Sequence, residues 1–141
     1  MLIARDLMTE SPATIGPAWT IRSAVRLLQT LDVRHLPVVN EQGELVGMLS
    51  DRDLRALAVP VIVGREYVGD IETALDASVS SLMNGDVRSV EEDDPASDVV
   101  EMMLENKIGA VPVTDADGKL VGIVSYIDVL RSMPLEADAA Q

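Results

Sequence analysis

Hydrophobic and polar residues follow the same pattern twice along the chain, at a constant separation of 75 positions. The segment VGMLSDRDL at 46–54 matches VGIVSYIDV at 121–129. The same offset also pairs Leu7-Met8 with Leu82-Met83, Pro37-Val38 with Pro112-Val113, and Gly43 with Gly118. Because the register is kept without a gap, it indicates an internal repeat, with copies over 6–54 and 81–129.

The spacing of apolar positions predicts the order strand, helix, strand, strand, helix in each copy. PATI at 12–15 is a short predicted strand. Both copies then show an apolar stripe at helical spacing: Ile21, Ala24, Val25, Leu28 and Leu31 in the first, and Ala96, Val99, Val100 and Met103 in the second. Asp94 followed by Pro95 indicates a helix start, with Pro95 at the first helical position.

Two strand pairs follow these helices. The runs LPVVNEQGELVGML at 36–49 and VPVTDADGKLVGIV at 111–124 each predict two strands joined by a turn that ends at Gly43 or Gly118. The strands are apolar almost throughout, which indicates that both of their faces are covered. One repeat is too small to bury its own faces, so we expect the two to pack face to face as one domain, with a cleft along their pseudo-twofold seam.

The expected organisation is repeat 1 over 1–58, an inter-repeat segment over 59–78, repeat 2 over 79–133 and a disordered tail over 134–141. A helix is predicted over about 67–77. The apolar stretch LAVPVIV at 57–63 must be buried, either by packing between the repeats or against a second subunit.

Composition and charge narrow the function classes. The chain has 141 residues, of which 48% are hydrophobic and 2% aromatic, as expected for a folded domain with an aliphatic core. A net charge of -13 argues against nucleic-acid binding. With no Cys and one His, thiolate and multi-histidine metal sites are excluded. No apolar run is long enough to span a membrane and no secretory leader is visible, so we expect a cytoplasmic protein without membrane association.

Ser50 with Asp53, and Ser125 with Asp128, permit two interpretations. As capping boxes they would satisfy backbone N–H groups at a helix start, worth about 1 kcal/mol each. As a ligand site, the hydroxyl and free N–H groups would bind an anion, and the carboxylate would accept hydrogen bonds from a vicinal diol. Asp in place of the usual Glu or Gln, and a Gly three residues before each Ser, favour the ligand.

Taken in order, Leu-Met, an apolar-Pro-Val strand and Gly-x-x-Ser-x-x-Asp resemble a tandem pair of CBS domains, the repeat named after cystathionine beta-synthase, of the stand-alone bacterial and archaeal type. The resemblance covers the chain apart from the inter-repeat segment and the tail. It implies an α/β (α+β) fold of two pseudo-symmetric β-α-β-β-α repeats packed as one Bateman module. Such modules usually form homodimers and often bind adenosine-containing ligands in the cleft between repeats.

The resemblance also implies roles for individual residues. In that family the Ser contacts phosphate or ribose and the Asp takes the ribose hydroxyls, a hydroxyl of the first strand points at the ligand, and basic residues before the second strand face phosphates. The implied nucleotide-binding positions are Thr14, Arg34, His35, Ser50, Asp53, Ser89, Gly109, Ala110, Ser125 and Asp128.

Charge supports part of this set independently. On so acidic a chain, an anionic ligand needs cations within the screening length of ~8 Å at physiological salt. Arg34, His35 and Arg52 are the candidates. The second copy has Gly109 and Ala110 at the places of Arg34 and His35, so we expect one cleft to be empty or selective for a less charged ligand.

Three other features have simpler explanations. DADG at 115–118 lacks the later ligands of a calcium loop and predicts a hairpin turn. EEDD at 91–94 precedes a predicted helix, where acidic residues favour the positive end of the dipole, so a metal site is not predicted. Trp19 is expected to pack on a neighbouring residue, the alternative being stacking on a ligand.

The function predicted is a regulatory module, not an enzyme, because no nucleophile with a base, phosphate-binding lysine loop or dinucleotide motif is present. It would sense AMP, ADP, ATP, S-adenosylmethionine or an NAD-like compound and signal to an unidentified effector protein. No cofactor is required, and Mg²⁺ is a candidate companion of the nucleotide. The alternative is a structural oligomerisation or interaction module without a small-molecule ligand.

Overall fold

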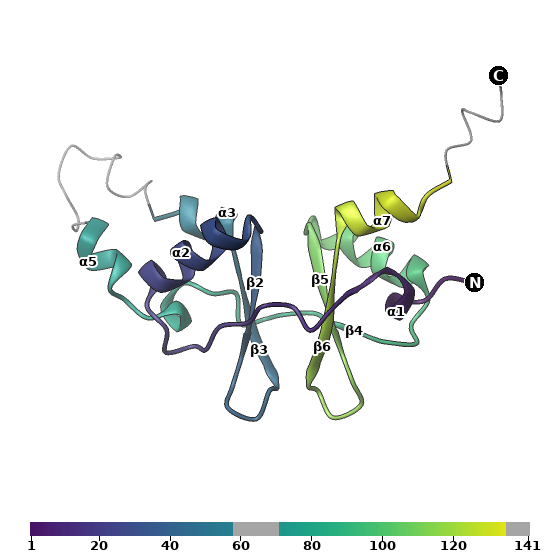
Figure 1. Ribbon diagram of the computed structural model, residues 1–141, viewed down its shortest axis with the longest axis horizontal. Helices are drawn as coiled ribbons and strands as arrows, with labels where there is room; N and C mark the ends of the chain where they lie inside the picture. Colours follow the sequence, from purple (N-terminus) through teal and green to yellow (C-terminus); the bar gives the residue numbers. More distant parts are fainter. Residues whose placement is uncertain (58–70, 135–141) are drawn as a thin grey trace, which may run out of the picture. The chain divides into compact units, whose positions relative to one another are not determined.

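The computed structural model describes residues 1–57 and 71–134, and the chain divides into two compact units (Figure 1). Unit A consists of residues 13–87, and unit B consists of residues 1–12 together with 88–141. The fold is mixed α+β, as the sequence predicts. The units divide the chain differently from the sequence repeats, because the first twelve residues belong to unit B.

Unit A is organised around one antiparallel hairpin. Its elements are α2 (Ile21–Leu31), β2 (His35–Val39), β3 (Leu45–Ser50), α3 (Asp51–Arg55), α5 (Ile71–Leu75) and the short 3₁₀ helix η1 (Val79–Ser81). The predicted turn between β2 and β3 is present, with Gly43 at φ +84°, a conformation that favours glycine. In Figure 1 this turn lies at the end of the hairpin away from α3.

Unit B contains a four-stranded sheet in the order β1-β6-β5-β4. Its elements are α1 (Ala4–Leu7), β1 (Thr9–Glu10), β4 (Val90–Glu91), α6 (Ala96–Asn106), β5 (Ala110–Thr114), β6 (Leu120–Ser125) and α7 (Tyr126–Ser132). β4 pairs with β5 in parallel and the other pairs are antiparallel. None of the helices in 1–57 and 71–134 is long and apolar enough to cross a membrane.

The two repeats exchange their first residues. Thr9 of β1 pairs with Ile123 of β6, although Thr9 lies at the start of the first repeat. At the matching positions of unit A, Asn84 forms an antiparallel bridge with Met48, with backbone hydrogen bonds of 3.0 and 3.1 Å. Each hairpin is therefore flanked by a segment from the beginning of the other repeat.

Each unit has its own apolar core, which contains residues of both repeats. The core cluster of unit A consists of the buried residues Ile15, Ala24, Leu28, Leu36, Val38, Leu49 and Val79, with Leu82 and Met83 packed against them. The core cluster of unit B consists of Ala4, Leu7, Val90, Val99, Val111, Val113 and Val124, with Met8 packed against them. Every residue of β5 is buried, including Thr114 at its end, as its largely apolar sequence predicts.

Several local predictions are corrected by the structure. PATI forms no strand, because in this segment only Ile15 pairs, through a single parallel bridge to Val38. Leu31 is 43% exposed at the end of α2, and Leu27 packs on the core instead. Pro95 is the N-cap of α6, one residue before the predicted position.

The described residues test only part of the predictions for the inter-repeat helix and the C-terminal tail. Within the predicted helix over 67–77, the observed helix α5 covers Ile71–Leu75. Arg22 of α2 pairs with Glu72 and Asp76 at 2.6 and 3.3 Å. The predictions for LAVPVIV and for the tail fall almost entirely outside the described residues, which include only Leu57 and Pro134 of these segments.

A methionine from one repeat lies directly over a glycine of the other. A Cβ built on Gly47 would lie 2.5 Å from the sulfur of Met83, closer than real Cβ atoms approach. A Cβ on Gly122 would lie 2.9 Å from Cγ of Met8 and 3.0 Å from the backbone oxygen of Thr9. The group that approaches each glycine is therefore a core methionine, which explains both the Gly and the Leu-Met motif.

Substituting these glycines tests this packing. Gly122→Ala is expected to lower the free energy of unfolding by about 1–3 kcal/mol, since the added methyl meets backbone as well as side chain. Gly47→Ala is expected to cost less, because only the flexible Met83 must move. Gly85 has nothing within 4 Å of its Cβ position, so Gly85→Ala controls for the loss of glycine's freedom in the unfolded chain. Equal urea unfolding of Gly122→Ala and Gly85→Ala would contradict the packing.

Candidate functional site

The predicted binding residues of the first repeat all lie in unit A. Site A comprises Thr14, Arg34, His35, Ser50 and Asp53. His35 opens β2 and lies directly opposite Ser50, the last residue of β3. The backbone N–H of Asp51 donates to the carbonyl of Arg34 at 3.0 Å, which ties the start of α3 to the residue before β2. Four of the five residues are thus brought together at the open end of the hairpin.

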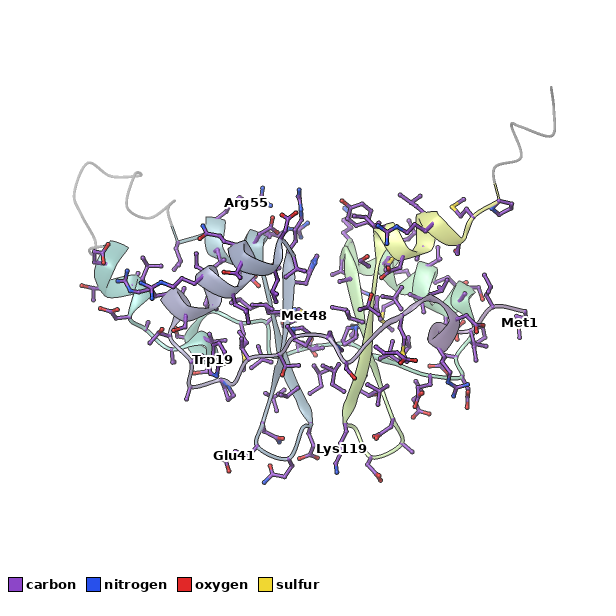
Figure 2. All side chains as sticks on the ribbon, viewed as in Figure 1. Met1, Trp19, Glu41, Met48, Arg55 and Lys119 are labelled. Carbon is purple, nitrogen blue, oxygen red and sulfur yellow. The ribbon has the colours of Figure 1, made fainter. Side chains whose placement is uncertain are left out.

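The side chains labelled in Figure 2 locate the open end of the hairpin. Arg55 on α3 lies at the opposite end of the hairpin from Glu41, which is in the turn (Figure 2). Thr14 stands on the neighbouring segment, next to Ile15, whose N–H donates to the carbonyl of Pro37 at 3.1 Å.

Ser50 and Asp53 form a complete capping box at the start of α3. The Asp53 N–H donates to Ser50 Oγ at 3.3 Å, and the Ser50 N–H donates to Asp53 Oδ2 at 2.8 Å. The Ser50 hydroxyl also donates to Asp53 Oδ2 at 3.1 Å. The structural interpretation of this motif is therefore correct, and the shorter Asp reaches back as well as a Glu would.

The cap uses only one oxygen of each Asp. Asp53 accepts both hydrogen bonds at Oδ2, and no residue in the described part of the chain donates to its Oδ1. Asp128 has the same arrangement, with the Ser125 N–H at 2.8 Å and the Ser125 hydroxyl at 3.0 Å from its Oδ2. A carboxylate oxygen that is held in place and accepts nothing can accept hydrogen bonds from a ligand hydroxyl. Capping and ligand binding are compatible.

Site B repeats this geometry in unit B with different side chains. It comprises Ser89, Gly109, Ala110, Ser125 and Asp128. Ala110 lies opposite Ser125, and the N–H of Tyr126 donates to the carbonyl of Gly109 at 3.0 Å. The backbone connections of site A and site B are therefore equivalent.

Sequence reasoning overlooked one buried polar residue of unit B. Thr114, the last residue of β5, is buried, and its Oγ1 lies 3.5 Å from Oγ of Ser89. The corresponding position in the first repeat is Val39, so this pair of hydroxyls occurs only in unit B. A single polar residue at the end of an otherwise apolar strand was the available signal.

The electrostatics of site A centre on His35. Burial lowers the pKa of the imidazole because it disfavours the charged form. The carboxylates of Asp51 and Asp53 act against this by raising the pKa, while Arg34 and Arg52 lower it further. The histidine is therefore a neutral hydrogen-bonding group near pH 7, placed beside two guanidinium groups.

The remaining motifs serve the fold. Arg5 pairs with Glu92 at 3.3 Å and with Asp93 at 2.8 Å, and the carboxylate of Asp94 accepts the Glu91 N–H at 2.8 Å. In DADG, Oδ1 of Asp115 accepts the N–H groups of the turn, as predicted for a hairpin. Among residues 1–57 and 71–134, no cluster of three or more His, Asp or Glu is placed to hold a metal ion.

Trp19 is partly exposed beside a glycine. Its side chain is 42% exposed, and the nearest ring atom lies 3.3 Å from the Cβ position of Gly16. The backbone of Trp19 joins η1, because its carbonyl accepts the Val79 N–H at 2.7 Å. This packing agrees with the prediction that the indole lies against a neighbouring residue.

Comparison with known proteins decides the family. The model of the CBS domain matches the chain twice, over residues 4–60 and 79–135. The chain belongs to the CBS-domain family. It is 30% identical over 129 residues to a CBS domain-containing protein of Dictyostelium discoideum, covering 92% of this chain and 89% of that protein. Other curated relatives are longer, and the chain spans 23% to 45% of three of them.

Two solved structures show which ligands related CBS pairs have been crystallised with. The structure of CBSX2 in complex with AMP is 29% identical, with a TM-score of 0.79 and full coverage of both chains. The CBS domain pair of protein MJ0100, solved with 5′-methylthioadenosine and S-adenosyl-L-methionine, is 28% identical with a TM-score of 0.77, covering 93% of this chain and 94% of that one. Related CBS pairs thus bind adenosyl compounds.

Removing either partner of the site A capping box is expected to destabilise the protein by about 1 kcal/mol. Because Ser50 and Asp53 stabilise the same turn, the double variant Ser50→Ala, Asp53→Ala should cost less than the sum of the single changes. Chemical unfolding of the four proteins measures this. Asp51→Ala is the control, since it removes a carboxylate from the same turn outside the box. Additive losses would contradict a shared box.

The lowered pKa of His35 predicts how stability depends on pH. The unfolded imidazole takes up a proton near its ordinary pKa of 6.5, while the folded state resists protonation. The His35 contribution to stability is therefore fully present above pH 6.5 and is lost as the pH falls below it toward the folded pKa. Urea unfolding at pH 8 and pH 5.5 should show a larger loss of stability for the wild type than for His35→Gln. A larger loss for the variant would contradict the sign.

Proposed function

We propose that this protein is a regulatory ligand-binding module that senses an adenosine-containing compound and signals to a partner protein. The observation that carries the proposal is the pair of Asp carboxylates that each keep one oxygen unused by the cap in the described structure, at equivalent places in site A and site B. Related CBS pairs crystallised with AMP, 5′-methylthioadenosine and S-adenosylmethionine support adenosine as the common part of the ligand.

Each group of the sites has a defined task in this proposal. The free oxygens of Asp53 and Asp128 accept hydrogen bonds from the two ribose hydroxyls, which fixes the nucleoside at the helix start. In site A, His35 lies opposite Ser50, and Arg34 is the preceding residue, so the imidazole and the guanidinium are the groups that would hold a phosphate. A ligand shifts the equilibrium between two conformations of the module only by its difference in affinity for them. In this proposal the partner protein binds one of these conformations preferentially. We propose no catalytic step for these residues.

The alternative function is a structural or interaction module without a ligand. It is favoured by the complete capping boxes and by the methionines that account for Gly47 and Gly122, because these features need no ligand. A test must therefore separate the capping role of each Asp from the ligand role.

Thermal unfolding with candidate ligands provides this test. AMP, ADP, ATP, S-adenosylmethionine and NAD are compared with GTP, with and without Mg²⁺. A compound at one hundred times its dissociation constant should stabilise the native state by about 2.7 kcal/mol, a rise of several degrees in Tm at this chain length. The expected result is a rise with one or more adenosyl compounds and none with GTP.

Amide variants then assign the effect to the sites. Asn in place of Asp53 or Asp128 keeps one acceptor for the cap but loses the second carboxylate oxygen, so it should reduce the ligand-induced rise while changing the ligand-free Tm little. Asp51→Asn is the matched control, with the same change of charge on the same helix outside the box. If no adenosyl compound raises the Tm of the wild type, the module has no such ligand and the interaction function is preferred.

A further inference from the structure

Residues 1–12, here called the N-terminal segment, pack in unit B although the chain continues from them directly into unit A. The Ala4 N–H donates to the carbonyl of Asp94 at 2.8 Å, and the Ala4 side chain is fully buried in the unit B core. Thr9 pairs with Ile123 of β6, so the segment also supplies the edge strand of the sheet. These contacts bind a segment of this sequence, and a second copy of the chain carries the same sequence.

Unit B is incomplete without such a segment. In the strand order β1-β6-β5-β4, removal of β1 would leave β6 as an open sheet edge, which can pair with another chain. The core positions of Ala4 and Leu7 would also be unfilled. Unit B therefore needs an N-terminal segment, from whichever chain provides it.

The connection between the N-terminal segment and unit A is strained at Ser11. Its φ is +46°, in the left-handed region, which a residue with a Cβ adopts at a cost. Pro12 follows, and the residue before a proline favours extended backbone. Asp86 is the equivalent residue of the second repeat, and its φ is not positive. The strain therefore belongs to this connection and is not a property of the repeat.

Strain at this place favours exchange of the segment between two chains. A short linker holds the segment near its own unit B at an effective concentration of about 1 mM, which favours the single chain. Release of one L residue from the left-handed conformation shifts such an equilibrium by about tenfold. Strained hinges promote exchange because the contacts formed are the same and only the hinge differs.

We propose that unit B of one chain binds the N-terminal segment of a second copy, whose unit B binds the segment of the first. The resulting exchanged homodimer forms at protein concentrations of about 0.1 mM and above. The surface that binds the second copy is the edge of β6 together with the core positions of Ala4 and Leu7. The exchange needs no ligand, so its test is separate from that of the proposed function.

Introduced cysteines can detect the exchange, because the chain contains none. Thr9 and Ile123 lie directly opposite each other in β1 and β6. The full-length variants Thr9→Cys and Ile123→Cys are mixed, unfolded in urea, refolded together and oxidised, at about 0.01 mM and at about 1 mM, the linker's effective concentration. The expected result is a mixed disulfide between the two chains, in excess over both homodisulfides and increasing with concentration, identified by intact mass spectrometry.

Unit A provides a matched control for this experiment. Asn84 and Met48 are the equivalents of Thr9 and Ile123 one repeat away, and they form the corresponding antiparallel bridge. Both belong to the continuous stretch 13–87, so exchange at Ser11 leaves them in the same chain. A mixture of Asn84→Cys and Met48→Cys chains should therefore give no mixed disulfide above the level of its homodisulfides.

Hinge variants test the cause of the exchange without cysteines. Ser11→Gly removes the cost of the positive φ, so it should weaken dimerisation at least tenfold in sedimentation equilibrium. Ala13→Gly is the control, because Ala13 is also exposed but has no positive φ, and it should change the dimerisation constant less than twofold. Both side chains are exposed, so both variants are expected to fold.

Three results would overturn the proposal. The first is a mixed disulfide of Thr9→Cys and Ile123→Cys no more abundant than that of the unit A control. The second is a dimer in sedimentation without this mixed disulfide, which would mean that the chains associate through another surface. The third is equal dimerisation of Ser11→Gly and Ala13→Gly. None of these results affects the proposed function, which the Tm panel decides.

Discussion

Met83 lies over Gly47 in unit A and Met8 lies over Gly122 in unit B, so a side chain from the start of one repeat fills the space left by a missing Cβ in the hairpin of the other. Close packing of this kind tolerates neither a residue larger than glycine in the hairpin nor a residue smaller than methionine against it. Since each core also contains the Leu that precedes the Met, neither repeat holds all the residues of its own unit. Because the first segments are exchanged, each unit contains residues of both sequence repeats.

The hairpins assembled in this way hold the candidate binding residues in place. The last residue of β3 or β6 is the Ser that caps the next helix, and the antiparallel register sets it opposite the first residue of β2 or β5. A carboxylate engaged in the cap through one oxygen has little freedom to rotate, so its other oxygen is preorganised for an incoming hydroxyl. One side chain can thus stabilise the helix and bind a ligand without conflict between the two roles.

The two units repeat one local backbone arrangement with different side chains. The backbone hydrogen bonds that support site A recur in site B at the same lengths, so the scaffold need not change when the chemistry does. The differences fall on residues that project from this scaffold, such as Arg34 and Arg52 in one repeat and Gly109 and Ile127 in the other. The first repeat therefore carries two cations at positions where the second carries none.

The sequence by itself determined the features that depend on near neighbours. The repeat, both helical stripes, the turns at Gly43 and Gly118, and the Ser and Asp three residues apart all follow from local periodicity and local hydrogen bonding. Only the tertiary structure decided which group approaches Gly47, that PATI makes one bridge instead of a strand, and that His35 is buried enough to lower its pKa. These properties depend on residues that are distant in the chain. The periodicity of one segment shows which of its faces is buried, but it carries no information about which other segment packs against that face.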